Sequence, residues 1–305
     1  MAGASGAIGT PLVRQLLGAG HEVTGMTRRE ERAEALREAG AEAVVCDAFD
    51  AEALREAVVA ARPEAVVHLL TALPPKMSPN PELGPTNRLR TEGTRNLVAA
   101  AEAAGARRLV AESIAFAYAQ RGAWVKDEED ELFADASGSF AATVAALGDL
   151  EDQVAAAEGI EGLVLRYGFL YGPGTYYAAD GSQADEFRKR RAPVVGEGTA
   201  VFSFIHVEDA AAATVAALEG GAPGVYNVVD DEPARMSEWM PAYAEALGAK
   251  PPRRIPTWMA RLAVGADAVG LATEMRGADN AKAKRELGWE PAYPSWRRGF
   301  AASLR

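Results

Sequence analysis

The glycine-rich start of the chain constrains its fold more than any other sequence feature. The first nine residues read MAGASGAIG, which places Gly3, Gly6 and Gly9 three residues apart. Glycine has no Cβ to block the approach of a pyrophosphate, and it allows the backbone angles of a tight turn at a helix N-terminus. Such a turn binds a dinucleotide when a strand precedes it and a helix follows it. The segments on either side of the turn therefore determine whether it is a dinucleotide-binding turn.

The helix is present, but the strand is not. Residues 10–20 read TPLVRQLLGAG, with apolar residues on one helical face and glycines at the end. Only two residues precede the turn, whereas a typical strand has about five. The first strand of this architecture lies in the middle of the sheet. We therefore expect the natural protein to begin upstream, with Met1 standing where an apolar strand residue belongs; the DNA upstream would test this.

Composition narrows the class of protein. The 305 residues are 49% apolar and 25% charged, with a formal net charge of -11. This length suffices for a nucleotide-binding core and a smaller lobe, and the acidic balance argues against a nucleic-acid partner. Cys46 alone forms no internal disulfide, three scattered histidines form no metal cluster, and no apolar run reaches membrane-spanning length. We expect a soluble cytoplasmic protein with no bound metal and no membrane partner.

The first half of the chain alternates between strand and helix patterns. Strands are predicted at 21–27, 41–47, 64–70, 107–113 and 161–168, and helices at 30–39, 51–62, 86–105 and about 141–157. Parallel strands joined by helices need right-handed crossovers that cover both faces of the sheet. The fold class predicted is α/β, with a doubly wound parallel sheet of the Rossmann type from which the first strand is missing.

The regular alternation ends after Gly168. We expect a dinucleotide-binding Rossmann domain over 1–168, to which the strand and helix of 201–228 return. Residues 169–200 and 229–305 are expected to form a smaller C-terminal substrate lobe. Such a lobe lies over the carboxyl ends of the strands, where open α/β sheets bind their ligands.

Several segments occur in an order that is specific when they are taken together. They are GASGAIG; Asp47 at a strand end; AVVHLL; Asn87 with EGTRNLVAAAEAAG; the strand ending in Ser113; LRYGFLYGPG; FIHVEDAAAA; YNVVDDEP; and KRELGW. In this order they resemble the extended short-chain dehydrogenase/reductases of the NAD-dependent epimerase/dehydratase type over nearly the whole chain. The resemblance implies a nicotinamide cofactor and a small-molecule substrate. It also leaves open a homodimer formed through the two long helices.

The residues after the strand at 21–27 bear on which cofactor is expected. Members that prefer NAD carry an acidic residue there, whereas a 2′-phosphate needs positive charge. This chain has Thr27, Arg28 and Arg29, and arginine binds phosphate bidentately. Their alternative role is the solvated start of the next helix. NADP(H) is favoured over NAD(H), with Arg28 as the contact. The cofactor-binding residues implied are Gly3, Ser5, Gly6, Ala7, Ile8, Gly9, Thr27, Arg28, Asp47, Ala48, Leu69, Leu70, Thr71, Asn87 and Tyr167.

The catalytic pair of the family is absent. Its members carry Tyr-x-x-x-Lys on the helix after the fifth strand, where the tyrosine exchanges a proton with substrate and the lysine holds the nicotinamide ribose. Alignment on Glu151 puts Thr143 at the tyrosine and Leu147 at the lysine, and no lysine lies between Lys126 and Lys189. The hydroxyl groups that remain near the predicted cleft belong to Ser113, Tyr118, Thr143 and Tyr167. We take these four as catalytic candidates, with packing as the alternative.

Other polar residues have a structural alternative that we favour. His206 is expected to link the two lobes, and His68 to be a hydrogen-bonded core residue. The basic run 188–191 either attracts an anionic substrate or forms a solvated helix face, of which the second is commoner. Cys46 is expected to pack in the core.

Two classes of function remain. The first is an NAD(P)-dependent oxidoreductase or epimerase/dehydratase-like enzyme that lacks the usual pair. The second is a non-catalytic NAD(P)-binding sensor or scaffold. We favour the enzyme, because the cofactor carries out the difficult chemistry and the protein need only position it. Nothing in the sequence identifies a sugar, and the apolar residues near Phe169 and Trp258 suit a less polar substrate equally well.

Overall fold

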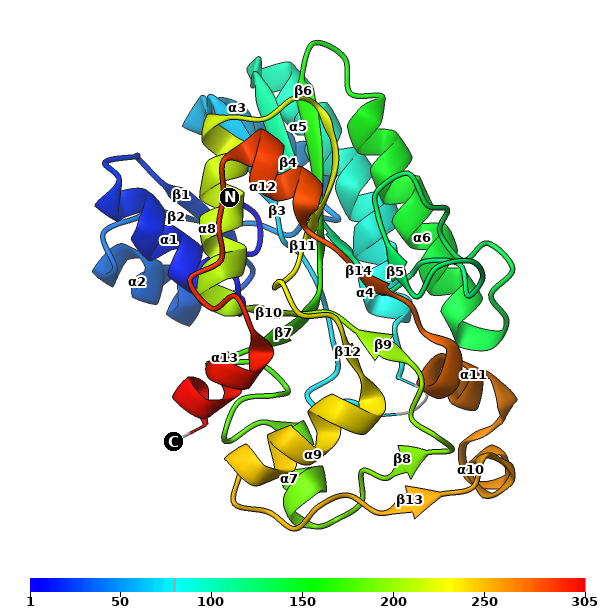
Figure 1. Ribbon diagram of the computed structural model, residues 1–305. Coiled ribbons are helices and arrows are strands. Elements are labelled where there is room, and N and C mark those ends of the chain that lie inside the picture. The colour runs from blue at the N-terminus through cyan, green and yellow to red at the C-terminus, as the bar shows by residue number, and fades with distance from the viewer. Residues whose placement is uncertain (79–80, 305) are drawn as a thin grey trace.

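The computed structural model describes residues 1–78 and 81–304 and is built on a parallel β-sheet. Its strands follow the spatial order β2–β1–β3–β4–β6–β11, with Ala2 bridging β1 and β3 (Figure 1). Their bounds are β1 Thr24–Thr27, β2 Glu42–Val45, β3 Ala65–His68, β4 Arg108–Ile114, β6 Glu161–Tyr167 and β11 Gly224–Val228. The predicted doubly wound parallel sheet is confirmed.

The two residues before the glycine turn lie in the middle of this sheet. Ala2 pairs in parallel with Met26 of β1 and with His68 of β3. Its N–H donates to the Val67 carbonyl at 2.8 Å, and its carbonyl accepts from the Leu69 N–H at 2.9 Å. The chain therefore enters the turn from the centre of the sheet, at the carboxyl ends of β1 and β3.

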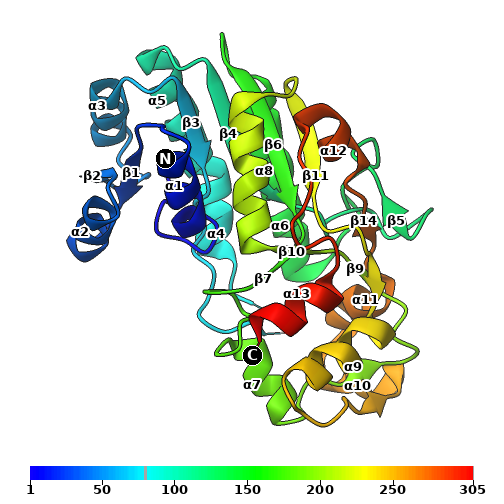
Figure 2. The same ribbon diagram turned by 60° about the vertical axis from the view of Figure 1, so that its left-hand side comes forward.

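Helices cover both faces of the sheet (Figure 2). One face carries α1 (Gly9–Gly18), α8 (Val207–Glu219) and α12 (Ala281–Leu287). The other carries α3 (Ala51–Ala61), α5 (Thr94–Ala104) and α6 (Gly138–Ala155), while α2 (Glu30–Glu38) packs against β1 and β2. The Asp50 side chain caps α3 by accepting from the Ala53 N–H at 3.1 Å.

The helix predicted from Thr86 to Gly105 is not uniform. It consists of α4 (Gly84–Arg88), a single π-turn η1 (Leu89–Gly93) and α5 in direct succession. A π-turn carries one extra residue in its hydrogen-bonded ring, and such turns occur often at functional sites. The face of this segment that meets α6 is therefore rotated at Arg90.

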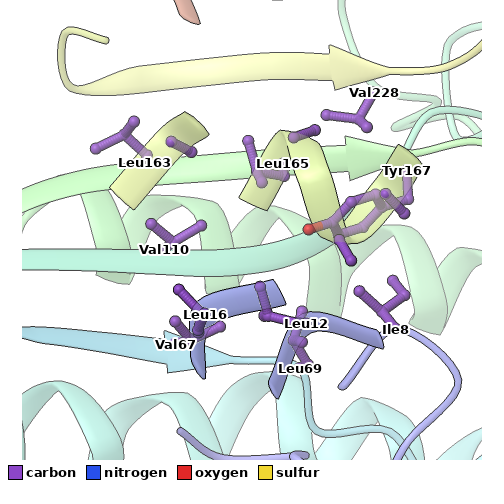
Figure 3. Close-up of a cluster of buried hydrophobic side chains, with 14 of the residues drawn as sticks. Ile8, Leu12, Leu16, Val67, Leu69, Val110, Leu163, Leu165, Tyr167 and Val228 are labelled. Carbon is purple, nitrogen blue, oxygen red and sulfur yellow. The ribbon is translucent and has the colours of Figure 1, made fainter. Parts of the chain in front are cut away.

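Apolar side chains fix α1 against the sheet (Figure 3). Leu12 and Leu16 of α1 belong to one buried cluster with Val110 of β4 and Leu163 and Leu165 of β6. All five are buried, and complete burial of such a side chain stabilises the fold by about 1.5–3 kcal/mol. The start of α1, and with it the glycine turn, is thus held rigidly at the sheet.

The part of the chain after Gly168, apart from α8, β11 and α12, gathers near the carboxyl ends of β4 and β6 (Figure 1). Its helices are α7 Ser182–Arg188, α9 Met236–Ala246, α10 Thr257–Val264, α11 Ala266–Glu274 and α13 Trp296–Ser303. Its short strands pair as β7 Phe169–Tyr171 with β10 Phe204–His206, β8 Val194–Val195 with β13 Arg254–Ile255, and β9 Val201–Phe202 with β12 Ala234–Arg235. The pair of β5 Val125–Lys126 and β14 Gly277–Ala278 joins this part to the loop after β4.

Aromatic side chains form the core of this part, with Phe204 packed against Trp239, Trp296 and Phe300. Within residues 1–78 and 81–304, no helix is both long and apolar enough to cross a membrane.

Candidate active site

One cavity of about 910 Å³ begins at the glycine turn and ends among aromatic residues of the second half of the chain. It follows the carboxyl ends of β1, β3, β4 and β6. The predicted site residues that line it are Ser5, Gly6, Ala7, Thr27, Arg28, Thr71, Ser113, Thr143 and Tyr167. The predicted residues that are not part of its lining are Gly3, Ile8, Gly9, Asp47, Ala48, Leu69, Leu70, Asn87 and Tyr118.

The glycines have two different roles in the turn. Gly3 has a φ of +90°, and a Cβ there would lie 2.6 Å from the Leu69 carbonyl oxygen. A Cβ on Gly9 would lie 2.2 Å from the Gly3 carbonyl oxygen, well inside contact distance. These two glycines allow the turn to close, and Ile8 anchors it in the core. Gly6, between Ser5 and Ala7, presents its backbone to the cavity.

Three arginines line the cavity beside the glycine turn. Arg28 and Arg29 follow β1, and Arg32 lies on the first turn of α2. The Arg32 Nη1 donates to the Ser5 Oγ at 3.3 Å, which ties α2 to the turn. Arg32 was not among the predicted residues, although its position in the first turn of the predicted helix at 30–39, close to Arg28 in sequence, could have indicated it. This end of the cavity is suited to bind phosphate.

Several predicted cofactor residues support the cavity from behind. Asp47 accepts from the Phe49 N–H at 3.0 Å, and the Ala48 carbonyl accepts from Asn96 at 2.9 Å. Leu69 is buried against α1, and the Leu70 N–H donates to His68 Nδ1 at 3.2 Å. Asp47, Ala48, Leu69 and Leu70 therefore shape the strand ends.

Thr143 and Leu147, both on α6, occupy the positions that align with the family's tyrosine and lysine. Thr143 lines the cavity, and its Oγ1 accepts from Asn87 Nδ2 at 3.3 Å. Leu147 is completely buried and packs in a cluster with Ala117 and Val144. The site thus has a neutral hydroxyl and an apolar side chain where the family has its acid/base pair.

Ser113 and Tyr118 belong to one buried hydrogen-bond network. The Ser113 hydroxyl donates to Glu151 at 2.7 Å, and Glu151 also accepts two hydrogen bonds from Arg166, at 2.9 and 2.6 Å. Arg166 Nη1 donates in turn to the Tyr118 hydroxyl at 2.9 Å, and that hydroxyl donates to Asn227 at 2.7 Å. Burial raises the pKa of Tyr118 to about 12. The network holds β4, α6, β6 and β11 together.

Tyr167 brings its ring, but not a free hydroxyl, to the cavity. Its hydroxyl lies 2.6 Å from the Thr214 Oγ1 on α8, on the side of the sheet that α1 and α8 cover (Figure 3). Burial raises the pKa of Tyr167 above its ordinary value. Both tyrosine hydroxyls proposed from the sequence therefore already have partners within the protein.

A buried ion pair that sequence reasoning missed lines the middle of the cavity. Arg90 of η1 donates to the Glu112 carboxylate of β4 at 3.4 Å, and the two side chains are 4% and 11% exposed. Burial raises the pKa of Glu112, and the Arg90 charge partly opposes this. Arginine within a polar helical stretch is most often solvated, and the π-turn that sets Arg90 apart is visible only in the structure.

His68 lies behind this pair as an uncharged core residue. Its Nε2 lies 2.9 Å from the Thr94 Oγ1, and its Nδ1 accepts from the Leu70 N–H. Burial, and then the charge of Arg90, lower the pKa of His68 to about 4. The expected hydrogen-bonded core histidine is confirmed.

The far end of the cavity is aromatic and apolar. The rings of Phe116 and Phe169 stack with their centroids 4.1 Å apart. Tyr176, Tyr177, Leu271 and Met275 line the same end. Among the described lining residues outside the arginines at 28, 29 and 32, Arg90 is the one with a cationic side chain. Three carboxylic side chains line the same region, those of Glu112, Asp180 and Asp267. This end suits a flat, weakly polar molecule without a large negative charge.

Other residues considered from the sequence have structural roles. His206 caps α8 by accepting from the Glu208 N–H at 3.2 Å, and its ring packs on Tyr293. Arg188, Lys189 and Arg191 pair with the carboxylates of α7 at its exposed surface. Cys46 is buried, and burial raises the pKa of its thiol.

Comparisons with known proteins agree with this geometry. A model of the NAD-dependent epimerase/dehydratase family matches residues 1–228. The chain is 51% identical over 303 residues, 98% of each chain, to a Streptomyces protein named 3-diazoavenalumate denitrifying reductase. The dTDP-glucose 4,6-dehydratase DesIV of Streptomyces venezuelae, solved as a double mutant with NAD, is 20% identical at a TM-score of 0.76, covering 100% of this chain and 94% of that one. Human epimerase family protein SDR39U1, solved with NADPH, is 20% identical at 0.73, covering 99% and 97%.

Proposed function

Because the chain belongs to the NAD-dependent epimerase/dehydratase family and is an enzyme of the extended short-chain dehydrogenase/reductase type, we propose that it is a nicotinamide-dependent reductase that removes dinitrogen from a small aromatic diazo compound. The observation that carries this proposal is the full-length similarity to the Streptomyces reductase, whose name describes the reductive loss of nitrogen from a diazo substrate. The chemistry of the cavity supports it.

The residues at the first end of the cavity fit a nicotinamide dinucleotide. The backbone of Ser5, Gly6 and Ala7 lines the cavity just before α1, where a pyrophosphate is stabilised by N–H groups at a helix N-terminus. Arg28 and Arg32 supply the positive charge that a 2′-phosphate needs. We therefore assign NADP(H) as the preferred cofactor. When bound, the reduced cofactor supplies a hydride.

The other end of the cavity fits an aromatic substrate. Phe116 and Phe169, which stack on one another, line this end with aromatic surface, and an aromatic contact to a flat ring would add about 0.5–1.5 kcal/mol beyond its burial. A nucleotide sugar would bring a diphosphate to this end, where the carboxylates of Asp180 and Asp267 lie. Among the described lining residues, Arg90 is the one cation besides Arg28, Arg29 and Arg32. Acidic side chains instead favour a neutral or cationic diazo group.

The absence of Tyr-x-x-x-Lys is consistent with this reaction. Reduction of a ketone needs a proton at the oxygen, and the family's tyrosine supplies it. In the exchange of dinitrogen for hydride the C–N bond breaks and its electron pair leaves with N₂, while the hydride pair forms the new C–H bond. An aryldiazonium cation and a hydride thus give an arene and N₂ with no proton consumed. Thr143 and Leu147 are adequate residues for such a site.

The proposal is tested by mixing the protein with NADPH and an aryldiazonium salt that carries hydroxyl and carboxylate substituents and labelled nitrogen. We expect one N₂ released for each NADPH oxidised, measured by gas mass spectrometry and absorbance. NADPH deuterated at the transferred position should place deuterium on the ring carbon that carried nitrogen. Tight NADPH binding with no release of labelled N₂ from any such substrate would overturn the reductase proposal and favour the non-catalytic sensor.

The two parts of the chain divide this work in our proposal. Residues 1–168 and 201–228 bind the nucleotide, since they supply the glycine turn and the strands of the parallel sheet. Residues 169–200 and 229–305 bind the substrate, since they supply Phe169, Tyr176, Tyr177, Leu271 and Met275 to the cavity.

A further inference from the structure

The guanidinium of Arg90 has fewer partners than its burial requires. Its one recorded hydrogen bond, to Glu112, is long at 3.4 Å. Its Nε is buried without a hydrogen-bond partner among residues 1–78 and 81–304. Because a buried charge that lacks hydrogen bonds is costly, an oxygen ligand in the cavity would stabilise this guanidinium.

The order of the strands places Arg90 and Glu112 along the cavity, beyond the glycine turn. The carboxyl ends of β1, β3 and β4 contribute Thr27 and Arg28, then Thr71, then Glu112 in sheet order. The arginines at 28 and 32 mark the end that suits an adenosine 2′-phosphate, and the glycine turn marks the pyrophosphate. The half of the dinucleotide beyond the pyrophosphate then reaches β4, where the Arg90–Glu112 pair lies.

The chemistry of the pair matches a vicinal diol. A guanidinium donates hydrogen bonds only, and a carboxylate accepts them, so together they satisfy two adjacent hydroxyl groups. The neighbouring helix α6 offers the neutral Thr143 to the cavity, while Leu147 is buried in the core. Among the described lining residues of this part of the cavity, the pair is the one place where a donor and an acceptor of opposite charge adjoin.

We propose that Arg90 and Glu112 bind the ribose of the nicotinamide half of the cofactor, with Arg90 donating to one hydroxyl and Glu112 accepting from the other. The inference rests on the nicotinamide cofactor of the proposed function. The pair acts as a positioning device, because it holds the sugar and not the reacting carbon. The π-turn at Leu89–Gly93 has the role of directing Arg90 toward β4.

The test compares the two halves of the cofactor by calorimetric titration. Arg90→Met should weaken the binding of NADPH by about tenfold or more, the effect of losing a hydrogen bond to a charged group. It should leave the affinity for adenosine 2′,5′-bisphosphate, which lacks the nicotinamide half, unchanged. Arg95→Met, at an exposed arginine on the neighbouring α5, is the matched control and should change neither affinity.

Two further results keep the inference falsifiable. The double variant Arg90→Met with Glu112→Leu removes both charges, so it should fold even if the single variant does not, and it should show the same selective loss. Wild-type affinity for NADPH in either folded variant, or equal weakening of both ligands, would overturn the inference. Failure of the wild-type protein to bind either ligand would instead overturn the cofactor assignment of the proposed function.

Discussion

Removing the Arg166 guanidinium should strongly destabilise the protein, because it leaves the Glu151 carboxylate buried without its cation. Arg166 donates to both Glu151 oxygens, at 2.9 and 2.6 Å, and to the Tyr118 hydroxyl at 2.9 Å. The Arg166 and Glu151 side chains are only 6% and 11% exposed. Removing one partner of a buried pair costs about 3–5 kcal/mol, so we expect Arg166→Met to lose that much free energy of unfolding.

Urea titration followed by tryptophan fluorescence measures this loss directly. A thermal melt gives a second measurement. In a chain of this size a loss of about 1 kcal/mol lowers the melting temperature by roughly 2 °C, so we expect a fall of about 6–10 °C. The double variant Arg166→Met with Glu151→Met removes both charges and should be less destabilised than the single variant. A loss below about 1 kcal/mol in Arg166→Met would refute the reasoning, because the pair would then be as weak as an exposed one.

The same network predicts what Tyr118 does. Tyr118→Phe removes one hydrogen-bonded hydroxyl and should cost about 1–2 kcal/mol of stability, with the turnover of a diazo substrate unchanged. A folded Tyr118→Phe protein that binds NADPH normally and no longer releases N₂ would show that the tyrosine acts in the reaction itself.

Three other predictions follow from the surroundings of the site. The pKa of His68 is about 4 in the folded chain against about 6.5 unfolded, so the unfolded state binds more protons between these values and stability falls as pH drops from 6.5 to 4, by about 3 kcal/mol; His68→Gln should flatten that decline in urea titrations, and an unchanged decline would contradict it. Gly9→Ala puts a Cβ 2.2 Å from the Gly3 carbonyl and should cost about 1–3 kcal/mol and weaken NADPH binding, whereas Gly18→Ala, which meets no atom within 4 Å, should do neither. Arg28→Ala should weaken NADPH by about tenfold or more and leave NADH unaffected in a fluorescence titration, because only the former carries the 2′-phosphate; equal losses would refute the assignment.

Local patterns predicted most of the sheet. The alternation of apolar strands with capped helices identifies β1, β2, β3, β4 and β6 and the helices between them, because each element of a doubly wound fold is close in sequence to its neighbours. The cap at Asp50 and the turn at Gly3 and Gly9 are local as well, and the structure contains both.

The short strand pairs of the second half had no such signal. The pair of β5 and β14 joins residues near Val125 to residues near Gly277, and each strand has two residues. Strands this brief show no periodicity, and their partners are set by tertiary packing of aromatic side chains such as Phe204 and Trp239. Sequence patterns therefore predicted the nucleotide end of the cavity better than the aromatic end.

The hydroxyl candidates show why the type of a residue predicts less than its partners do. Ser113, Tyr118, Thr143 and Tyr167 all lie at or near strand ends or on the adjoining helix, as the order of elements predicted. Each hydroxyl is already bonded within the protein, to Glu151, Asn227, Asn87 and Thr214 respectively. Their catalytic role stays a prediction. The argument for structural roles comes from these hydrogen-bond partners, which lie far away in the sequence and which no local pattern reveals.

The loss of the acid/base pair and the presence of Arg90 are connected by one electrostatic argument. A lysine at position 147 and a guanidinium at position 90 would place two positive charges on the facing elements α6 and η1, which pack together. Like charges on packed elements in a buried region repel each other. With leucine at position 147, the cation comes from the π-turn and is balanced by Glu112. Leu147→Lys would bury a second positive charge on α6, and the proposed reaction needs no proton from it. We therefore expect Leu147→Lys to lower stability without increasing the release of dinitrogen.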